Sequence, residues 1–237
     1  MKTEQEVQNF IAKEYPKRYS GTGFLYHSRL VTDMLQGAKF KDGRTSDKIL
    51  DVGCGIGFVS QLYPNFDIVG IDISDEMLKR NPFKWHKAPA EAIPFPDNHF
   101  DYVVCRSLLH HLENPVAGLR EMFRVLKPGG TWVAWDPNQN LLANLFRKLF
   151  QHTDRFSHLH KSFNDQELIG MVKSIGFTVT EAKYIGFLAY PLLGFPDIVN
   201  FNIPLGLGKL IMRVDELLSN TLLKRWAWSL RIKAIKQ

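Results

Sequence analysis

The chain has 237 residues, a net charge of +6 and two cysteines. This length fits one large α/β domain. Cys54 and Cys105 fall at predicted buried strand ends, away from any disulfide pattern, and two cysteines without clustered Cys/His spacing argue against a structural zinc. Free cysteines and a polar first ten residues without a signal-peptide pattern predict a reducing, cytoplasmic location and no metal.

Two helices are predicted before residue 46. Residues 4–15 place four apolar side chains near one face: Val7, Phe10, Ile11 and Tyr15. Residues 28–36 form the second helix, after a stretch rich in glycine and aromatic residues. We expect residues 1–45 to form an N-terminal helical lid, from which Tyr19, Tyr26 and His27 can reach a site.

The most informative segment runs from Lys48 to Val59 and reads as a buried strand, a glycine-rich turn and a helix. Gly53, Gly55 and Gly57 remove the Cβ atoms that would keep a ligand off the backbone. The free N–H groups of the following helix favour a carboxylate or phosphate there. Asp51 adds a carboxylate at the mouth of the turn.

A second apolar run, residues 67–72, ends in another acid nineteen positions after Gly53. In a nucleotide-binding βαβ unit, an acid at this place accepts hydrogen bonds from ribose hydroxyls, so Asp72 is a candidate ribose ligand. Taken alone, Asp72 can also be an acid that stabilises the N-terminus of the next helix through its negative charge. Phe58 stands where the third glycine of a dinucleotide fingerprint would fall, which disfavours an NAD-dependent oxidoreductase.

Strands and helices then alternate. Further strands are predicted at 84–88, 100–106, 131–136 and 178–184, and helices at 57–63, 75–80, 115–126 and 164–175. This alternation indicates an α/β fold with a parallel sheet and helices on both faces. A last strand is predicted near residues 226–236, where apolar and basic residues alternate, with the basic residues facing solvent.

Residues 186–224, between the last two predicted strands, are unusually apolar and are broken by prolines. The stretch is too interrupted for a membrane-spanning helix. This segment has three alternative uses: extra core, a dimer interface, or a substrate lid or platform that rests on a membrane surface. All of the positive excess lies after residue 140, which fits nucleic acid, an anionic membrane or solubility alone.

The pattern Asp51-x-Gly53-x-Gly55-x-Gly57, with Asp72 downstream, resembles motif I and the ribose acid of class I S-adenosylmethionine (SAM)-dependent methyltransferases. Residues 88–95, 100–112 and 121–130 follow in the order and spacing of the UbiE-like group. The resemblance covers residues 46–137 and, more loosely, 162–177. It implies a Rossmann-like fold with a seven-stranded, mostly parallel sheet and an antiparallel last strand. It also implies SAM as cofactor, S-adenosylhomocysteine as product, and a single methyltransferase domain over residues 1–237 with its SAM-binding core at 46–137.

The resemblance also implies roles for individual residues. The turn of Gly53, Cys54 and Gly55 would lie against the methionine part of SAM, with Asp51 near its amino group. Asp72 would hold the ribose and Ile73 would pack on the adenine. Ala90 and Glu91 would lie at the edge of the adenine. Arg106 and Ser107 would line the methionine side. Pro89 departs from the family pattern, because an acid that receives the adenine amino group usually stands there.

Methyl transfer from a sulfonium needs a general base only when the acceptor is a hydroxyl or an acidic carbon. Candidates follow the fourth and fifth strands, where ligands collect in an open sheet: His110, His111 and Asp136. One of the two histidines can instead cap or pack the following helix. His158 and His160 are further candidates from the loop before the last helix.

The leading functional hypothesis is a methyltransferase that acts on a small-molecule or lipid-like acceptor. A peripheral membrane contact is one possible use of the apolar segment. An RNA methyltransferase is the alternative that the C-terminal charge raises. No motif for a flipped base and no appended RNA-binding module accompany that charge, so a nucleic-acid partner is disfavoured. A non-catalytic SAM-binding module is the third hypothesis, because cofactor and acceptor sites are separate sets of residues.

Overall fold

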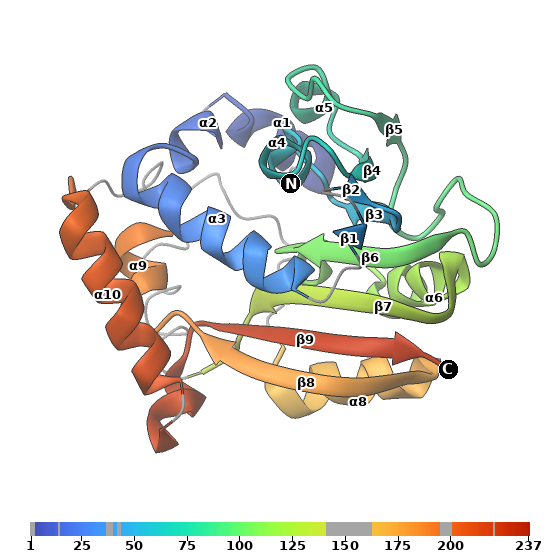
Figure 1. Ribbon diagram of the computed structural model, residues 1–237. Helices are drawn as coiled ribbons and strands as arrows, with labels where there is room; N and C mark the ends of the chain where they lie inside the picture. The colour runs from blue at the N-terminus through green and yellow to red at the C-terminus, as the bar shows by residue number, and fades with distance from the viewer. Residues whose placement is uncertain are drawn as a thin grey trace.

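The computed structural model describes residues 3–13, 15–36, 40–41, 44–140, 163–194, 201–219 and 221–237, and is built around one mixed sheet (Figure 1). The sheet has seven strands in the order β5-β4-β3-β6-β7-β9-β8. Their bounds are β3 Lys48–Val52, β4 Asp67–Asp72, β5 Trp85–Lys87, β6 Phe100–Arg106, β7 Leu126–Pro137, β8 Phe177–Ile185 and β9 Ser229–Lys236. Only β9 runs antiparallel to its neighbours, β7 and β8. The predicted fold class is confirmed.

Helices cover both faces of this sheet because successive residues of its buried strands point to opposite sides. Leu50 and Val52 belong to one core cluster, with α6 (Pro115–Val125) and α8 (Asp165–Ile175). Ile49 belongs to the other cluster, with α3 (Gly21–Leu35), α4 (Phe58–Leu62) and α9 (Ala189–Leu193). Smaller elements include α5 (Asp75–Leu78), the 3₁₀ turn η1 (Leu109–His111) and a hairpin of β1 (Phe40–Lys41) and β2 (Arg44–Thr45).

The N-terminal helices differ from the prediction in their bounds. A capping box between Thr3 and Glu6 starts α1 (Glu4–Ile11), which ends before the predicted residue 15, and α2 (Tyr15–Arg18) follows as a separate turn. Helix α3 begins at Gly21, seven residues before the predicted start. The buried side chains of Tyr26 and Leu30 pack on the sheet, and this packing outweighs the weak helix propensity of the glycines.

The prediction that the basic residues of the last strand face solvent is wrong for Arg231. Arg231 is only 5% exposed, contacts Glu181, and donates from Nη1 to the Asp33 carbonyl at 3.1 Å. Lys233 donates to the carbonyl of Gln36 at 2.9 Å. The alternating pattern identified two faces of the strand, but it carried no signal that the C-terminal end of α3 covers the second face.

The segment after β8 forms α9, α10 (Leu205–Leu218) and the 3₁₀ turn η2 (Leu222–Trp226). One buried carboxylate holds it together: Asp215 of α10 accepts the four consecutive backbone N–H groups of residues 186–189 at 2.6–3.0 Å. In this way α10 caps the start of α9. None of the described helices is long and apolar enough to cross a membrane.

Candidate active site

A cavity of about 440 Å³ lies at the carboxyl ends of β3, β4 and β6. Predicted site residues that line it are Gly53, Gly55, Asp72, Ile73, Ala90, Glu91, Arg106, Ser107 and His111. Helices α1 and α2 contribute a further wall that includes Glu4, Gln8, Tyr15 and Arg18. The topology thus brings most of the predicted residues together, beneath the N-terminal helices.

The glycine turn after β3 has a backbone that only glycine adopts without strain. Gly53 and Gly55 have φ angles of +75° and +51°, in the left-handed region. The N–H groups of Gly53 and Cys54 both donate to the carbonyl of Ile71, at 2.9 and 3.0 Å. The turn is therefore tied to β4 and presents bare backbone to the cavity.

Asp72 ends β4 at the cavity wall with a hydrogen bond on each carboxylate oxygen. Oδ2 accepts from the Gly55 N–H and Oδ1 from the Ser74 N–H, both at 2.8 Å. Burial raises the pKa of Asp72, and these N–H groups act in the opposite direction. The backbone N–H of Ile73 also acts on this carboxylate. An ionised carboxylate has about four acceptor positions, so capacity remains for a ribose hydroxyl.

Two predicted cofactor residues do not line the cavity. Asp51 lies in the buried strand with 3% exposure, where burial raises its pKa to about 7 although Arg106 opposes the shift. The side chain of Cys54 packs over Gly70, where a Cβ atom would lie 2.5 Å from its sulfur, and Sγ accepts from Asn81 at 3.5 Å. Cys54 therefore contributes backbone to the turn, while its thiol lies away from the cavity.

Arg106, at the end of β6, is held by residues of the N-terminal part of the chain. Its Nη2 donates to the hydroxyl of Tyr19 at 2.6 Å, and Nη1 lies 3.4 Å from Nδ1 of His27. The Tyr19 ring stacks on Phe58 with centroids 4.0 Å apart. Tyr26, another residue of this segment, is buried in the core instead. Aromatic side chains therefore fix the guanidinium at the cavity wall.

His27 connects this cluster to α9. Its Nε2 must donate to the Gly194 carbonyl at 3.0 Å, since a carbonyl only accepts, and Nδ1 then presents a lone pair to Arg106. Burial, with the nearby positive charge of Arg106, lowers the pKa of His27 well below its usual value. His27 is thus a neutral link between the arginine and the segment after β8.

Ser107 follows Arg106 in a strained backbone conformation. Its φ angle of +50° is unusual for a residue with a side chain, and its N–H donates to the Trp135 carbonyl at 2.7 Å. A non-glycine residue held in the left-handed region costs about 1–3 kcal/mol, and such residues cluster at functional sites. The strain lies at the point where β6 meets the cavity.

The two adjacent histidines have different surroundings. His110 is 3% exposed, and its Nδ1 lies 2.5 Å from Oδ1 of Asp136, a fully buried residue. Asp136 also accepts the backbone N–H groups of Leu109 and His110 at 3.1 and 3.2 Å, and burial raises its pKa to about 6. Neither His110 nor Asp136 lines the cavity, and the hydrogen bonds of Asp136 hold η1 against β7.

His111 is the predicted catalytic candidate that reaches the cavity. Its Nδ1 lies 2.9 Å from Oε1 of Glu4, and both residues belong to the cavity wall. A 3₁₀ turn rotates the chain by about 120° per residue, so neighbouring side chains point in different directions. His158 and His160 lie outside the described residues.

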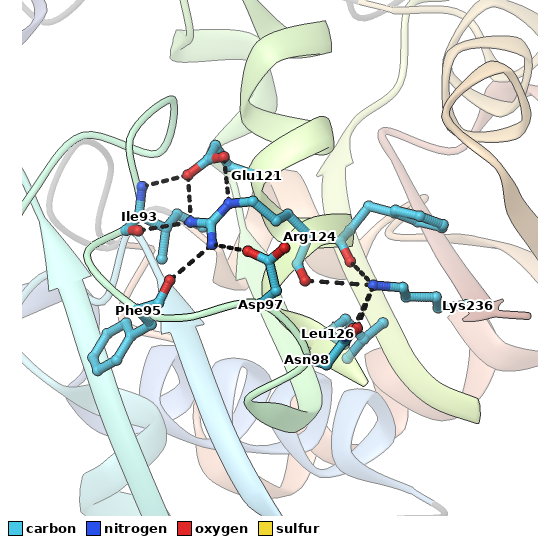
Figure 2. A network of polar contacts seen from close by, with 9 residues as sticks. Ile93, Phe95, Asp97, Asn98, Glu121, Arg124, Leu126 and Lys236 are labelled. Carbon is cyan, nitrogen blue, oxygen red and sulfur yellow. Dashed lines mark hydrogen bonds and ion pairs between the residues drawn. The ribbon is translucent and has the colours of Figure 1, made fainter. Parts of the chain in front are cut away.

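The sequence analysis did not identify a polar network around Arg124 (Figure 2). Arg124 contacts both carboxylate oxygens of Glu121 at 2.8 Å and Asp97 at 2.7 Å. The same guanidinium donates to the carbonyls of Ile93 and Phe95, each at 2.9 Å. It thus fastens the loop that follows Ala90 and Glu91 to α6. The i, i+3 spacing of Glu121 and Arg124 was the only sequence signal for this clamp.

The sequence comparisons agree with this geometry. Residues 50–134 match the family model described as a methyltransferase domain. A demethylmenaquinone methyltransferase from Geobacillus sp. WCH70 is 30% identical over 211 residues, which cover 75% of this chain and 89% of that protein. The protein of the same name from Staphylococcus carnosus is 29% identical, over 83% of this chain and 93% of its own length.

Solved structures show the same fold. A SAM-dependent methyltransferase from Thermotoga maritima, described as a possible histamine N-methyltransferase, aligns with a TM-score of 0.68 and 16% identity over 99% of this chain and 100% of its own. A Haemonchus contortus phosphoethanolamine N-methyltransferase with bound S-adenosylhomocysteine aligns with a TM-score of 0.65 and 15% identity, over 100% of this chain and 60% of its own.

A Rossmann-like sheet with a glycine turn and an acid at the end of the next strand defines a nucleoside-binding enzyme fold. The chain belongs to the class I SAM-dependent methyltransferases, within the UbiE-like group. Its cofactor is therefore SAM, and its product from the cofactor is S-adenosylhomocysteine.

Proposed function

We propose that this enzyme methylates a small, lipid-like acceptor of the quinone type, and that His111 receives the proton which the acceptor loses. The observation that carries the proposal is the pairing of His111 with Glu4 in the same cavity wall as Gly55 and Asp72. The acceptor class is supported by the relatives named demethylmenaquinone methyltransferases.

The proposed cofactor site follows the cavity wall. Gly53 and Gly55 would take the methionine part of SAM, with Arg106 and Ser107 beside it and Asp51 below it. Asp72 would accept a ribose hydroxyl. The adenine would lie between Ile73 and the loop of Ala90 and Glu91. The left-handed glycine turn and the unused acceptor capacity of Asp72 support this fit.

SAM supplies a methyl group that the positive sulfur has already activated. The chain has to place the acceptor in line with that methyl group and keep water away, and positioning of this kind contributes about 7–11 kcal/mol. As the new bond to the acceptor forms, the electron pair of the old bond stays on sulfur. An acceptor hydroxyl or acidic carbon releases a proton in this step, which His111 can take while Glu4 stabilises the resulting charge.

Helices α1 and α2 would act as the lid in this scheme. They supply Glu4, Tyr15 and Arg18 to the wall, and Tyr19, which follows α2, holds Arg106. Because these residues lie beside the proposed methionine side of the cofactor, opening of the lid would admit both SAM and the acceptor. Closure would then exclude water from the sulfonium.

The test is transfer of isotopically labelled methyl from SAM to a demethylated quinone supplied in its reduced, hydroquinone form, in parallel with a fractionated extract of the source cells. Label in the quinone and in the organic phase is expected. Label in aqueous metabolites or in RNA would overturn the acceptor class. Stabilisation of the protein by S-adenosylhomocysteine reports the cofactor site separately, whatever the acceptor.

A further inference from the structure

Helix α10 exposes several leucines on one side and buries a mixed set of small, polar and apolar residues on the other, so it departs from an ordinary surface helix. Its buried side is Gly208, Met212, Asp215 and Ser219, spaced at three and four residues. On the opposite side, Leu207, Leu210 and Leu217 are 49%, 55% and 71% exposed. The helix is the outermost element on its side of the molecule (Figure 1).

The packing of α10 accounts for its buried side. At Gly208 a Cβ atom would lie 2.9 Å from Cγ2 of Thr22, so glycine allows close contact with α3. Asp215 binds the backbone N–H groups that precede α9, and the Ser219 hydroxyl donates to the Asp215 carbonyl at 2.9 Å. The exposed leucines take no part in these contacts, so the fold alone does not explain them.

The apolar surface continues beyond the helix. In η2, Leu222 is 93% exposed and Trp226 is 43% exposed. Several large apolar side chains exposed on neighbouring elements of a globular protein indicate a site of interaction. A tryptophan at its edge suits the boundary between water and lipid, because the ring is apolar and its N–H is polar.

The charges beside these leucines are cationic. Lys209, Arg213 and Lys224 are exposed on this part of the chain. Residues 201–226 contain two acids, and both are engaged within the protein. Asp215 is buried on backbone N–H groups, and Glu216 pairs with Arg29 of α3 at 2.5 Å.

We propose that this surface, the α10 face, docks on an anionic lipid bilayer. We define the α10 face by Leu207, Leu210, Leu217 and Leu222 with Lys209 and Arg213. Leucines would enter the boundary between headgroups and acyl chains, and the cations would pair with lipid phosphates. The enzyme would then be a peripheral membrane protein, independently of which acceptor it methylates.

Charge complementarity selects a lipid over the other occupants. A second copy of the chain would bring Lys209 and Arg213 against the same cations, which opposes a symmetric dimer. A nucleic acid would satisfy the cations but leave the leucines in water. Only a surface that is both apolar and anionic satisfies both sets of residues.

Co-sedimentation tests the proposal with two kinds of vesicle, phosphatidylcholine alone and phosphatidylcholine mixed with phosphatidylglycerol. The full chain is expected to bind the mixed vesicles and to be released by salt. The double variant Leu210→Gln/Leu217→Gln should bind at least about tenfold more weakly. Lys209→Gln/Arg213→Gln should lose about fivefold for each cation removed.

Matched variants separate this surface from general effects. Leu210→Met/Leu217→Met keeps the apolar area and should bind as the wild type does. Lys79→Gln/Lys84→Gln removes two exposed cations near the opposite end of the sheet and should also leave binding unchanged. Stabilisation by S-adenosylhomocysteine confirms that each variant is folded.

Three results would overturn the proposal. The first is absence of vesicle binding by the wild type. The second is equal loss of binding in the α10 variants and in Lys79→Gln/Lys84→Gln. The third is a wild-type dimer in sedimentation velocity that Leu210→Gln/Leu217→Gln converts to a monomer without any change in vesicle binding, which would assign the α10 face to a second copy.

Discussion

Asp72 and Gly55 are joined by a 2.8 Å hydrogen bond from the glycine N–H to the carboxylate Oδ2. Asp72, which ends β4, therefore fixes the glycine turn that follows β3, and this turn also orients the Asp72 carboxylate. A ligand that binds the carboxylate therefore finds the glycine turn and the acid already held in position relative to each other. This preorganisation reduces the entropy lost on binding.

Replacing Asp72 by asparagine is expected to weaken SAM binding by about 10- to 100-fold, because a hydrogen bond to a charged group contributes about 1.5–3 kcal/mol. Calorimetric titration with S-adenosylhomocysteine measures the change. Asp75→Asn is the matched control, since that carboxylate is exposed and pairs with Lys87 at 2.7 Å. Equal affinities for the two variants would remove Asp72 from the cofactor site.

Replacing His111 by alanine is expected to lower turnover by about 100-fold or more, which is the range of general base catalysis, while affinity for S-adenosylhomocysteine stays unchanged. Glu4→Gln should lower turnover less, because it removes only the partner of the imidazole. The control is His86→Ala, on the exposed strand β5. A parallel loss of turnover and cofactor affinity in His111→Ala would indicate a packing role.

Asp51 should make the free energy of unfolding depend on pH. Its pKa is about 7 in the folded protein against an ordinary value of 3.8, so between these values the folded state holds a proton that the unfolded state has released. Stability from this group therefore falls as pH rises from about 4 to 7. Asp51→Asn removes the buried charge and should raise the unfolding free energy of the cofactor-free protein at pH 8 by about 2–4 kcal/mol.

Urea unfolding at pH 5 and pH 8 measures this effect. The gain in Asp51→Asn should be small at the lower pH and large at the higher one. A gain independent of pH would mean that the substitution acts through packing. The same variant should bind SAM more weakly if the carboxylate faces the amino group of the cofactor.

Asp215→Asn should destabilise the protein by about 2–4 kcal/mol, because an amide cannot accept four backbone N–H groups as a carboxylate does. Its neighbour Glu216 offers a matched control. The exposed pair of Glu216 with Arg29 is worth less than about 1 kcal/mol, so Glu216→Gln should change stability little. Similar urea midpoints for the two variants would contradict the capping role of Asp215.

Arg124→Lys should weaken SAM binding about tenfold and leave the turnover number nearly unchanged. Lysine cannot reproduce the fork that contacts Glu121 and the carbonyls of the 93–95 loop, so the loop that carries Ala90 and Glu91 would loosen. Arg120→Lys, on the exposed side of the same helix, is the control. A loss of turnover without loss of cofactor affinity would mean that Arg124 does not act through the cofactor-binding loop.

Much of the fold could be predicted from the sequence, because apolar runs and the glycine turn mark strands in their order along the chain. The glycine turn and Asp72 were also predictable as a pair, since their spacing reflects one βαβ unit. The partner of His111 was not, because Glu4 is brought to it only by the folded N-terminus. The burial of Arg231 and the orientation of the Cys54 thiol away from the cavity likewise depend on which elements pack against each strand. A single sequence does not contain that information.

Strand β9 sets the order in which the sheet can be completed. It follows every other described strand in the sequence, yet it lies between β7 and β8, and β8 pairs with no other described strand. On the ribosome, β8 therefore emerges before its only partner and exposes an unpaired edge until residues 229–236 follow. A chaperone that binds such edges could act between the emergence of β8 and that of β9, and a block in elongation in this interval would leave a sheet unable to close.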